Sequence, residues 1–189
     1  TKKKDTKSNL IVEGVVNKNN SVFLNKINFA ESKNFIKVKN INLNSKKKLK
    51  RIDQIDVDLV NNNDQISQLN IKRKKSNYSI NSKIFDGAKI LDKILFSKGD
   101  GNFFDVFEKL NSKIIINFNT IYVTNEDYLS NFKADMTVKN NQIIDLILSS
   151  QFSTKEDLKL SIKTNSNNER ITDLFAGNAK PLVKKYDFI

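Results

Sequence analysis

With 189 residues, the chain is long enough to fold as one sizeable domain around a buried core. It contains no cysteine and no histidine, which excludes disulfides, zinc-thiolate sites and Ser-His or Cys-His nucleophile pairs. We therefore expect a protein that is not an enzyme and that has no catalytic residues, no metal site and no cofactor.

The formal net charge of +12 at pH 7 suggests a negatively charged partner. The basic residues are 30 Lys and only 3 Arg, whereas contacts to base edges and phosphates favour the planar guanidinium. With 28 Asn and 22 Ile, the composition is typical of an AT-rich coding sequence. We interpret most of the charge as solvated surface and expect no nucleic-acid partner. Weak attraction to anionic lipid head groups stays open, at roughly 1 kcal/mol per Lys.

The termini and the hydropathy pattern bear on membrane association. No stretch approaches the roughly 20 apolar residues needed to cross a bilayer. The chain begins at Thr1 and ends at the apolar pair Phe188 and Ile189, so we interpret it as a piece of a longer protein. Any targeting signal or membrane anchor is then expected outside this piece.

The first 84 residues predict a meander of short strands. In the fourth of these, Ile55, Val57 and Leu59 fall on one face, which is the period of two that strands require. Four polar residues from Asn17 to Asn20 predict a hairpin turn between the first two strands. The predicted strands cover residues 10–16, 21–30, 34–43, 49–60, 65–74 and 77–84.

The pattern then changes to a helical period. Residues 85–96 place four apolar side chains on one stripe with Asp86 as N-cap, and residues 102–110 present a second stripe. We therefore predict a helical insert over residues 85–110, and a last helical segment over residues 172–187. In fold terms, helices are expected to interrupt the sheet near residues 86–110 and 173–186.

Residues 112–164 predict a sheet of four longer strands with one continuous apolar face. Such a face is usually ordinary core, but a one-layer sheet with few helices has little material to cover it. We therefore predict a mainly β fold, an elongated, curved, groove-like antiparallel sheet, with this face as the candidate working surface. The candidate lining residues are Ile114, Ile116, Phe118, Phe132, Met136, Val138, Ile144, Leu146, Leu148, Leu158, Leu160 and Ile162.

Other clusters have simpler interpretations. Asp53, Asp56 and Asp58 could bind a divalent cation, but no glycine-bearing calcium loop accompanies them, which favours a solvated strand face. The basic runs at residues 46–48 and 72–75 could bind phosphates, but without exposed aromatic neighbours they are typical of solvated turns.

Two segments carry a family resemblance. In residues 77–91 a strand ends in a Phe-Asp-small signature and runs into a predicted helix, which resembles a recurring element of the AsmA-like proteins, in particular their YhdP-type branch. Residues 174–186 are similar to the segment in which those proteins carry an Asp-Ala-Gly-x-Leu-Leu helix, although Asn178 and Lys180 stand in place of Asp and Gly. The resemblance covers roughly residues 65–189.

The resemblance implies one β-rich segment, residues 1–189, of a longer envelope protein of Gram-negative bacteria. Such proteins are anchored in the inner membrane and bridge the periplasm, and their apolar groove is expected to carry phospholipid acyl chains toward the outer membrane. Membranes would be contacted by regions outside this piece, and neighbouring segments of the long chain by strand pairing. Two alternatives remain: a structural or assembly module of the envelope, and, less favoured, a polyanion-binding domain.

Overall fold

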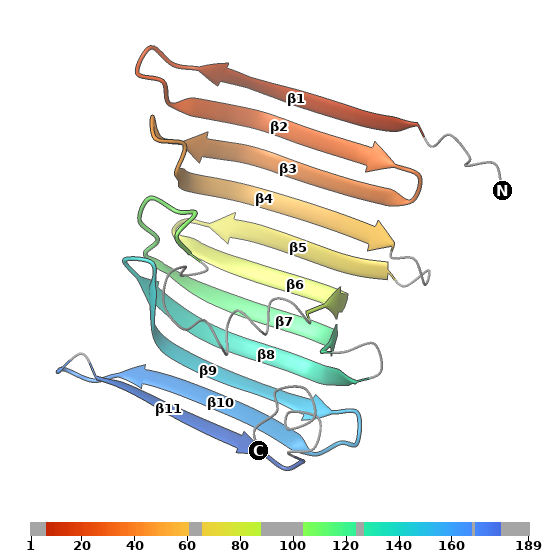
Figure 1. Cartoon of the computed structure of the whole chain (residues 1–189), viewed down its shortest axis with the longest axis vertical. Helices are drawn as coiled ribbons and strands as arrows, with labels where there is room; N and C mark the ends of the chain where they lie inside the picture. Colours follow the sequence, from red (N-terminus) through yellow and green to blue (C-terminus); the bar gives the residue numbers. More distant parts are fainter. Residues whose placement is uncertain (1–6, 61–65, 88–103, 124–126, 168, 179–189) are drawn as a thin grey trace.

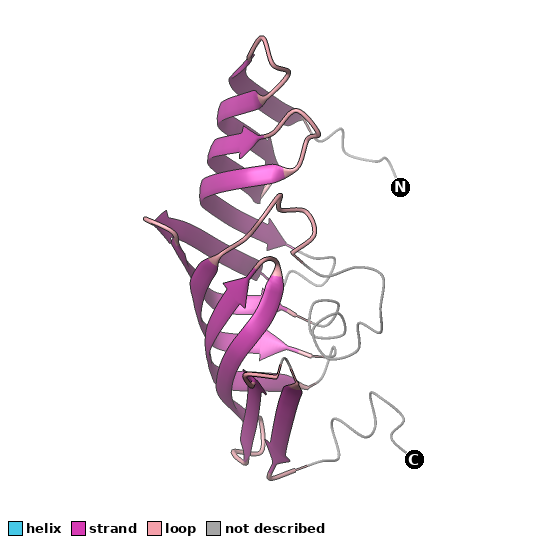
Figure 2. Cartoon of the chain, turned by 90° about the vertical axis from the view of Figure 1, so that its left-hand side faces the viewer, coloured by secondary structure: helices cyan, strands magenta, loops and turns pink. Residues whose placement is uncertain are grey.

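The computed structural model describes residues 7–60, 66–87, 104–123, 127–167 and 169–178. These residues form a single sheet of eleven strands whose order follows the chain (Figure 1). The strands are β1 (Ser8–Val16), β2 (Val22–Glu31), β3 (Asn34–Leu43), β4 (Leu49–Val60), β5 (Ile66–Lys74), β6 (Asn77–Asp86), β7 (Ser112–Tyr122), β8 (Tyr128–Lys139), β9 (Gln142–Phe152), β10 (Asp157–Thr164) and β11 (Arg170–Ala176). Figure 2 shows these strands as one strongly twisted layer.

The predicted strands are confirmed, two of them, β3 and β4, with the predicted bounds. The meander is antiparallel from β1 to β6 and again from β7 to β11, whereas β6 and β7 pair in parallel, which the sequence did not predict. A parallel pair needs a crossover to bring the chain back to the edge from which it started. Residues 87–111 connect the two strands and make this crossover.

The predicted helices are wrong, because the described residues contain no helix. Phe85 and Asp86, the predicted helix start, are the last residues of β6. Residues 104–106 form a turn, and Phe107 makes a parallel bridge to Leu49. The rest of the predicted insert, residues 88–103, lies outside the described residues.

The last predicted helix is replaced, over its described part, by β11. Residues 158–164 of β10 hydrogen-bond to it in an unbroken antiparallel register. Without this pairing β10 would present an open row of backbone donors and acceptors, so the tertiary context overrides a weak helical pattern. Residues 179–187 of the predicted helix lie outside the described residues.

One aliphatic residue from each strand stands in a line across the whole sheet. Residues paired directly across strands share a face, so the line defines one side of the sheet, here called the apolar face. Ten strand spacings give this line a length of about 48 Å. Its members are Val12, Ile27, Val38, Ile55, Ile71, Ile80, Ile116, Ala134, Leu148, Leu160 and Leu174.

The opposite side of the sheet, the polar face, carries a polar line from β2 to β10, and Ile11 and Phe175 continue its row in β1 and β11. The Asn70 amide donates to Asp56 within this line, and so does the Gln54 amide from the same strand as Asp56. The two lines reflect the alternation of apolar and polar residues along each strand. Successive side chains of a strand point to opposite faces, one to the apolar face and the next to the polar face. The polar line consists of Asn28, Lys37, Asp56, Asn70, Asn81, Asn117, Lys133, Ser149 and Lys159.

The end of the crossover lies against the sheet and shows that the sheet is curved. Leu49, at the start of β4, exchanges backbone hydrogen bonds with Val106 and Glu108, and the Asn141 amide donates to the Phe107 carbonyl at 3.1 Å. On a flat sheet the start of β4 and the β8–β9 turn would lie about 24 Å apart. Because one short segment bonds to both, the sheet curls around this crossing segment (residues 104–111).

Asn141 is the main polar anchor of the crossing segment. Its Oδ1 accepts from the Leu110 amide at 2.6 Å, and its φ of 66° is one that glycine adopts without strain. We therefore expect Asn141→Gly to lower the free energy of unfolding by about 1–3 kcal/mol, because it removes the side-chain hydrogen bonds to Leu110 and Phe107 without straining the turn. The measurement is urea unfolding followed by circular dichroism.

The neighbouring turn residue provides the control. Asn140 also has a positive φ, 51°, and its backbone amide donates to Asn111, a bond that glycine would keep. Asn140→Gly should therefore change the stability by less than about 0.5 kcal/mol. Equal losses for the two variants would mean that the turn conformation, and not the side chain of Asn141, holds the crossing segment.

Candidate functional site: the apolar face of the sheet

The structure brings the predicted lining residues together on the apolar face. Ten of the twelve are buried, with Val138 only 1% exposed, and Ile116 is partly buried against the same core. Ile144 differs, because a register shift leaves it unpaired opposite Val138, and Ile143 packs against the core instead. The buried ones are Ile114, Phe118, Phe132, Met136, Val138, Leu146, Leu148, Leu158, Leu160 and Ile162.

The apolar face extends well beyond the strands that the sequence singled out. Ile27, Ile55 and Ile71 lie on the same line of aliphatic residues and are half-buried, although they belong to β2, β4 and β5. The alternation in the sequence predicted a working surface in residues 112–164 only. The missed signal was the same period of two in the N-terminal strands, continued in register through the parallel pair β6–β7.

Burial along the apolar face is uneven. In β7 to β10 buried and exposed residues alternate almost without exception, and two residues of the crossing segment, Phe104 and Leu110, join the core there. In β2 to β5 the apolar side chains are mostly half-buried, and Val38, 9% exposed, is the one buried hydrophobic residue among the described part of these strands. The N-terminal half of the face therefore leaves apolar surface accessible.

Three aromatic rings tie the two halves of the sheet together. The ring of Phe118 in β7 lies 5.1 Å from that of Phe85 in β6 and 5.8 Å from that of Phe132 in β8, centroid to centroid. These rings bridge the parallel pair and the first antiparallel pair after it, on the apolar face. The parallel junction of β6 and β7, here called the seam between the two meanders, is thus held by side-chain packing as well as by backbone hydrogen bonds.

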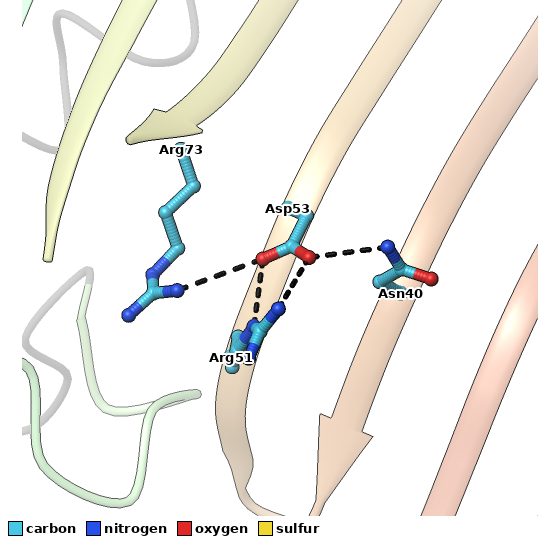
Figure 3. Close-up of polar contacts among 4 residues, drawn as sticks. All are labelled: Asn40, Arg51, Asp53 and Arg73. Carbon is cyan, nitrogen blue, oxygen red and sulfur yellow. Dashed lines mark hydrogen bonds and ion pairs between the residues drawn. The ribbon is translucent and has the colours of Figure 1, made fainter. Parts of the chain in front are cut away.

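A polar cluster lies near the starts of β4 and β6 (Figure 3). Arg51 donates to both oxygens of Asp53 at 2.7 Å, Asn40 donates to Oδ2 at 3.1 Å, and Arg73 stands 3.6 Å from Oδ1. The hydrogen bonds from Arg51 hold the pKa of Asp53 below its ordinary value, with desolvation opposing them. Close by, burial raises the pKa of the Tyr78 hydroxyl.

The cluster predicts a pH dependence of stability. The pKa of Asp53 is lower in the folded state than in the unfolded chain, where it is about 3.9. Its contribution to the free energy of unfolding is therefore present above the unfolded-state pKa and is lost as pH falls through the folded-state pKa. We expect Asp53→Asn to cost about 1–2 kcal/mol at pH 7 and progressively less below pH 4. Chemical denaturation at several pH values measures this, with Asp145→Asn, an exposed carboxylate of β9, as control. A stability difference between wild type and Asp53→Asn that stays constant down to pH 2 would show that the charge of Asp53 does not stabilise the fold.

The remaining candidates do not form a reactive centre. Within the described ranges, no three or more Asp, Glu, Cys or His side chains come together in a way that could hold a metal ion. Asp56 and Asp58, considered for a cation, flank Val57 and lie on the polar face, where Asp56 accepts hydrogen bonds from amide groups. No membrane-spanning helix occurs among the residues that the structure describes.

Comparisons with known proteins do not assign the chain to a family. No protein-family model, no curated protein and no solved structure matches it significantly. The resemblance to AsmA-like proteins therefore rests on the sequence segments alone.

Proposed function

We propose that this chain is a non-enzymatic segment of a periplasmic AsmA-like protein, held at the inner membrane by a segment outside this chain. In this proposal the apolar face carries phospholipid acyl chains between the inner and outer membranes. The observation that carries it is the unbroken aliphatic line through all eleven strands, combined with a polar line on the other face. A solvated sheet without a ligand has no need for such a line in its half-exposed N-terminal strands.

The dimensions and energetics support lipid. The aliphatic line is about 48 Å long, and its N-terminal part from β1 to β6, where apolar surface stays accessible, spans about 24 Å, more than the roughly 15 Å of one acyl chain. Each methylene group that leaves water for an apolar surface gains about 0.8 kcal/mol, so a half-exposed apolar strip can hold an acyl chain without any directional contact. Movement along the strip needs no reacting group, which agrees with the absence of histidine and cysteine.

The edge strands support pairing with neighbouring segments of a longer chain. Every residue of β1 is exposed, and apolar side chains of β11 are more than half exposed, among them Ile171, Leu174 and Phe175. Exposed edges with apolar residues are templates for strand addition. The same observation supports the second candidate function, a structural module of the envelope in which the sheet only continues a scaffold.

Two adjacent residues of β3 allow a matched test of lipid binding. Ile36 lies opposite Val57 on the apolar face, whereas Phe35 turns to the polar face and is 38% exposed. We expect the full-length protein, mildly extracted, to release phospholipid in native mass spectrometry, and Ile36→Glu to lower the bound amount severalfold. A carboxylate in the strip would be desolvated by an acyl chain, which is costly.

Phe35→Glu is the control, because it adds the same charge on the solvated face. It should leave the bound lipid unchanged, and circular dichroism should show both variants folded. A wild-type protein that carries no lipid would refute the proposal and favour the structural module. Equal losses for Ile36→Glu and Phe35→Glu would show that the charge, and not the apolar face, changes lipid binding.

A further inference from the structure

The strands end at two long edges of the sheet, and these edges differ in charge. One edge holds the β1–β2, β3–β4, β5–β6, β8–β9 and β10–β11 turns and the start of β7, on the left of Figure 1. The other holds the β2–β3 and β9–β10 turns and the ends of β6 and β7. The first, here the basic edge, carries Lys46, Lys47, Lys48, Lys74, Lys75 and Lys139.

The second edge, here the acidic edge, carries more carboxylates than lysines. Glu31, Asp86, Asp127, Glu156 and Asp157 lie there, among the described residues, beside Lys7, Lys33 and Lys155, and Lys159 pairs with Asp157 at 3.0 Å. Coding bias cannot produce this difference, because both edges belong to one chain and draw on one composition. On the basic edge the acidic residues are few, and Glu108 of the crossing segment is already paired with Lys50 at 3.6 Å. The basic edge therefore keeps a positive surplus.

Two of the three arginines reinforce the basic edge. Arg51 is the third residue of β4, and Arg73 is the last but one of β5. Both contact Asp53, so one carboxylate is shared by two guanidinium groups and one positive charge remains (Figure 3). Guanidinium groups present five donors each and suit phosphate oxygens. The basic edge thus combines lysines in the turns with arginines just inside the strands.

The apolar face fixes how a lipid would meet this edge. Strands of 9 to 12 residues, as most are here, make the face about 30–40 Å wide. One acyl chain spans half of a roughly 30 Å hydrocarbon core, about 15 Å. A lipid that lies along the strands can therefore keep its chains on the apolar face while its head group reaches water at one edge only.

We propose that the basic edge binds the phosphate of anionic lipid head groups, while the acyl chains lie along the strands on the apolar face. This inference rests on the proposed lipid-carrying function and adds the orientation and the head-group class. Long-range attraction to anionic phosphates selects lipids with a net negative charge over zwitterionic ones. The acidic edge repels the same head groups and so disfavours the reversed orientation.

The test uses the full-length protein and vesicles of equal parts phosphatidylglycerol and phosphatidylethanolamine. After incubation and re-isolation, the bound lipids are quantified by mass spectrometry. The wild type should be enriched in phosphatidylglycerol by about fivefold, the effect of roughly one lysine contact. A variant with Lys46, Lys47, Lys48, Lys74 and Lys75 all changed to Gln should bind as much total lipid, with an enrichment well below fivefold, because only Lys139 and the arginines of the basic edge remain.

A control variant removes the same charge elsewhere. Lys33, Lys83, Lys133, Lys155 and Lys159, outside the basic edge, are changed to Gln, and the enrichment should persist. Unchanged enrichment in the basic-edge variant, or equal loss in both variants, would overturn the inference while total lipid still supports the proposed function. A wild-type protein that carries no lipid would overturn both this inference and the proposed lipid-carrying function. Salt-sensitive binding of heparin that only the basic-edge variant loses, with lipid ratios unchanged, would assign the edge to a polyanion instead.

Discussion

Phe118→Ala is expected to lower the free energy of unfolding by about 3–5 kcal/mol. The ring is 7% exposed and lies between Phe85 and Phe132, so truncation removes contacts to both strands that flank β7. Relaxation cannot fill the cavity easily, because both neighbouring rings are held by strands in fixed register. Thermal and urea unfolding of the purified chain, followed by circular dichroism, would measure the loss.

The same substitution on an edge strand is the control. Phe175 in β11 is 57% exposed, and its ring makes one cation–π contact, with Lys159 at 5.8 Å. Phe175→Ala should cost less than about 1 kcal/mol. A loss for Phe118→Ala as small as that of the control would mean that the seam between the two meanders does not contribute to global stability.

Ile116→Glu is expected to destabilise the fold by about 2–4 kcal/mol, whereas Ile115→Glu should change stability by less than about 1 kcal/mol. The two isoleucines are adjacent in β7, but Ile116 packs against the core on the apolar face and Ile115 is 43% exposed on the polar face. Ile115 also lies opposite Asp135, which is paired with Lys113 at 2.8 Å. A carboxylate at position 115 would therefore lie near one negative and one positive side chain. Denaturant unfolding at pH 7 measures the difference.

The pH response separates a buried carboxylate from a general defect. At position 116 the apolar surroundings would raise the pKa of the new glutamate above its ordinary value of about 4.3. A raised folded-state pKa means that stability is recovered as pH falls and is lost as pH rises through that pKa. Ile116→Glu should therefore approach the wild type near pH 4 and fall behind it at pH 7. A pH-independent deficit, or an equal deficit for Ile115→Glu, would contradict the assignment of faces.

Strand positions and faces could be read from the sequence because they depend on local period. Ile55 and Val57 alternate with Asp56 and Asp58, and this pattern alone fixes which side chains share a face. The turn at Asn140 and Asn141 was likewise predictable, since asparagine tolerates the positive φ that a tight hairpin needs. Sequential hairpins then place neighbouring strands side by side without further information.

The crossover could not be predicted, because partners far away in sequence determine its conformation. Phe107 and Leu110 have helical spacing, yet the backbone around them bonds to Leu49 and Asn141, which lie on opposite sides of it in the chain. These tertiary hydrogen bonds outweigh differences in helix propensity, which amount to a few tenths of a kcal/mol per residue. The parallel pairing of β6 and β7 was missed for the same reason.

The candidate site was partly predictable. The apolar strip of β7 to β10 follows from alternation, but its extension to Val12 requires the register of every pair. The charge of the two edges was hidden in the linear sequence, because each turn contributes only a few lysines. Lys48 and Lys75 belong to turns separated by two whole strands and come to the same edge only in the folded sheet.

The single parallel pair has a consequence for how the chain folds. Each meander is assembled from hairpins whose partners are close in sequence, and such contacts form quickly. Pairing β6 with β7 must first close the loop from residue 87 to 111, and this entropic cost precedes any gain from the seam. The two meanders are therefore expected to form as separate cooperative units and to join last, so amides at the β6–β7 seam should exchange with solvent before those inside β8 and β9.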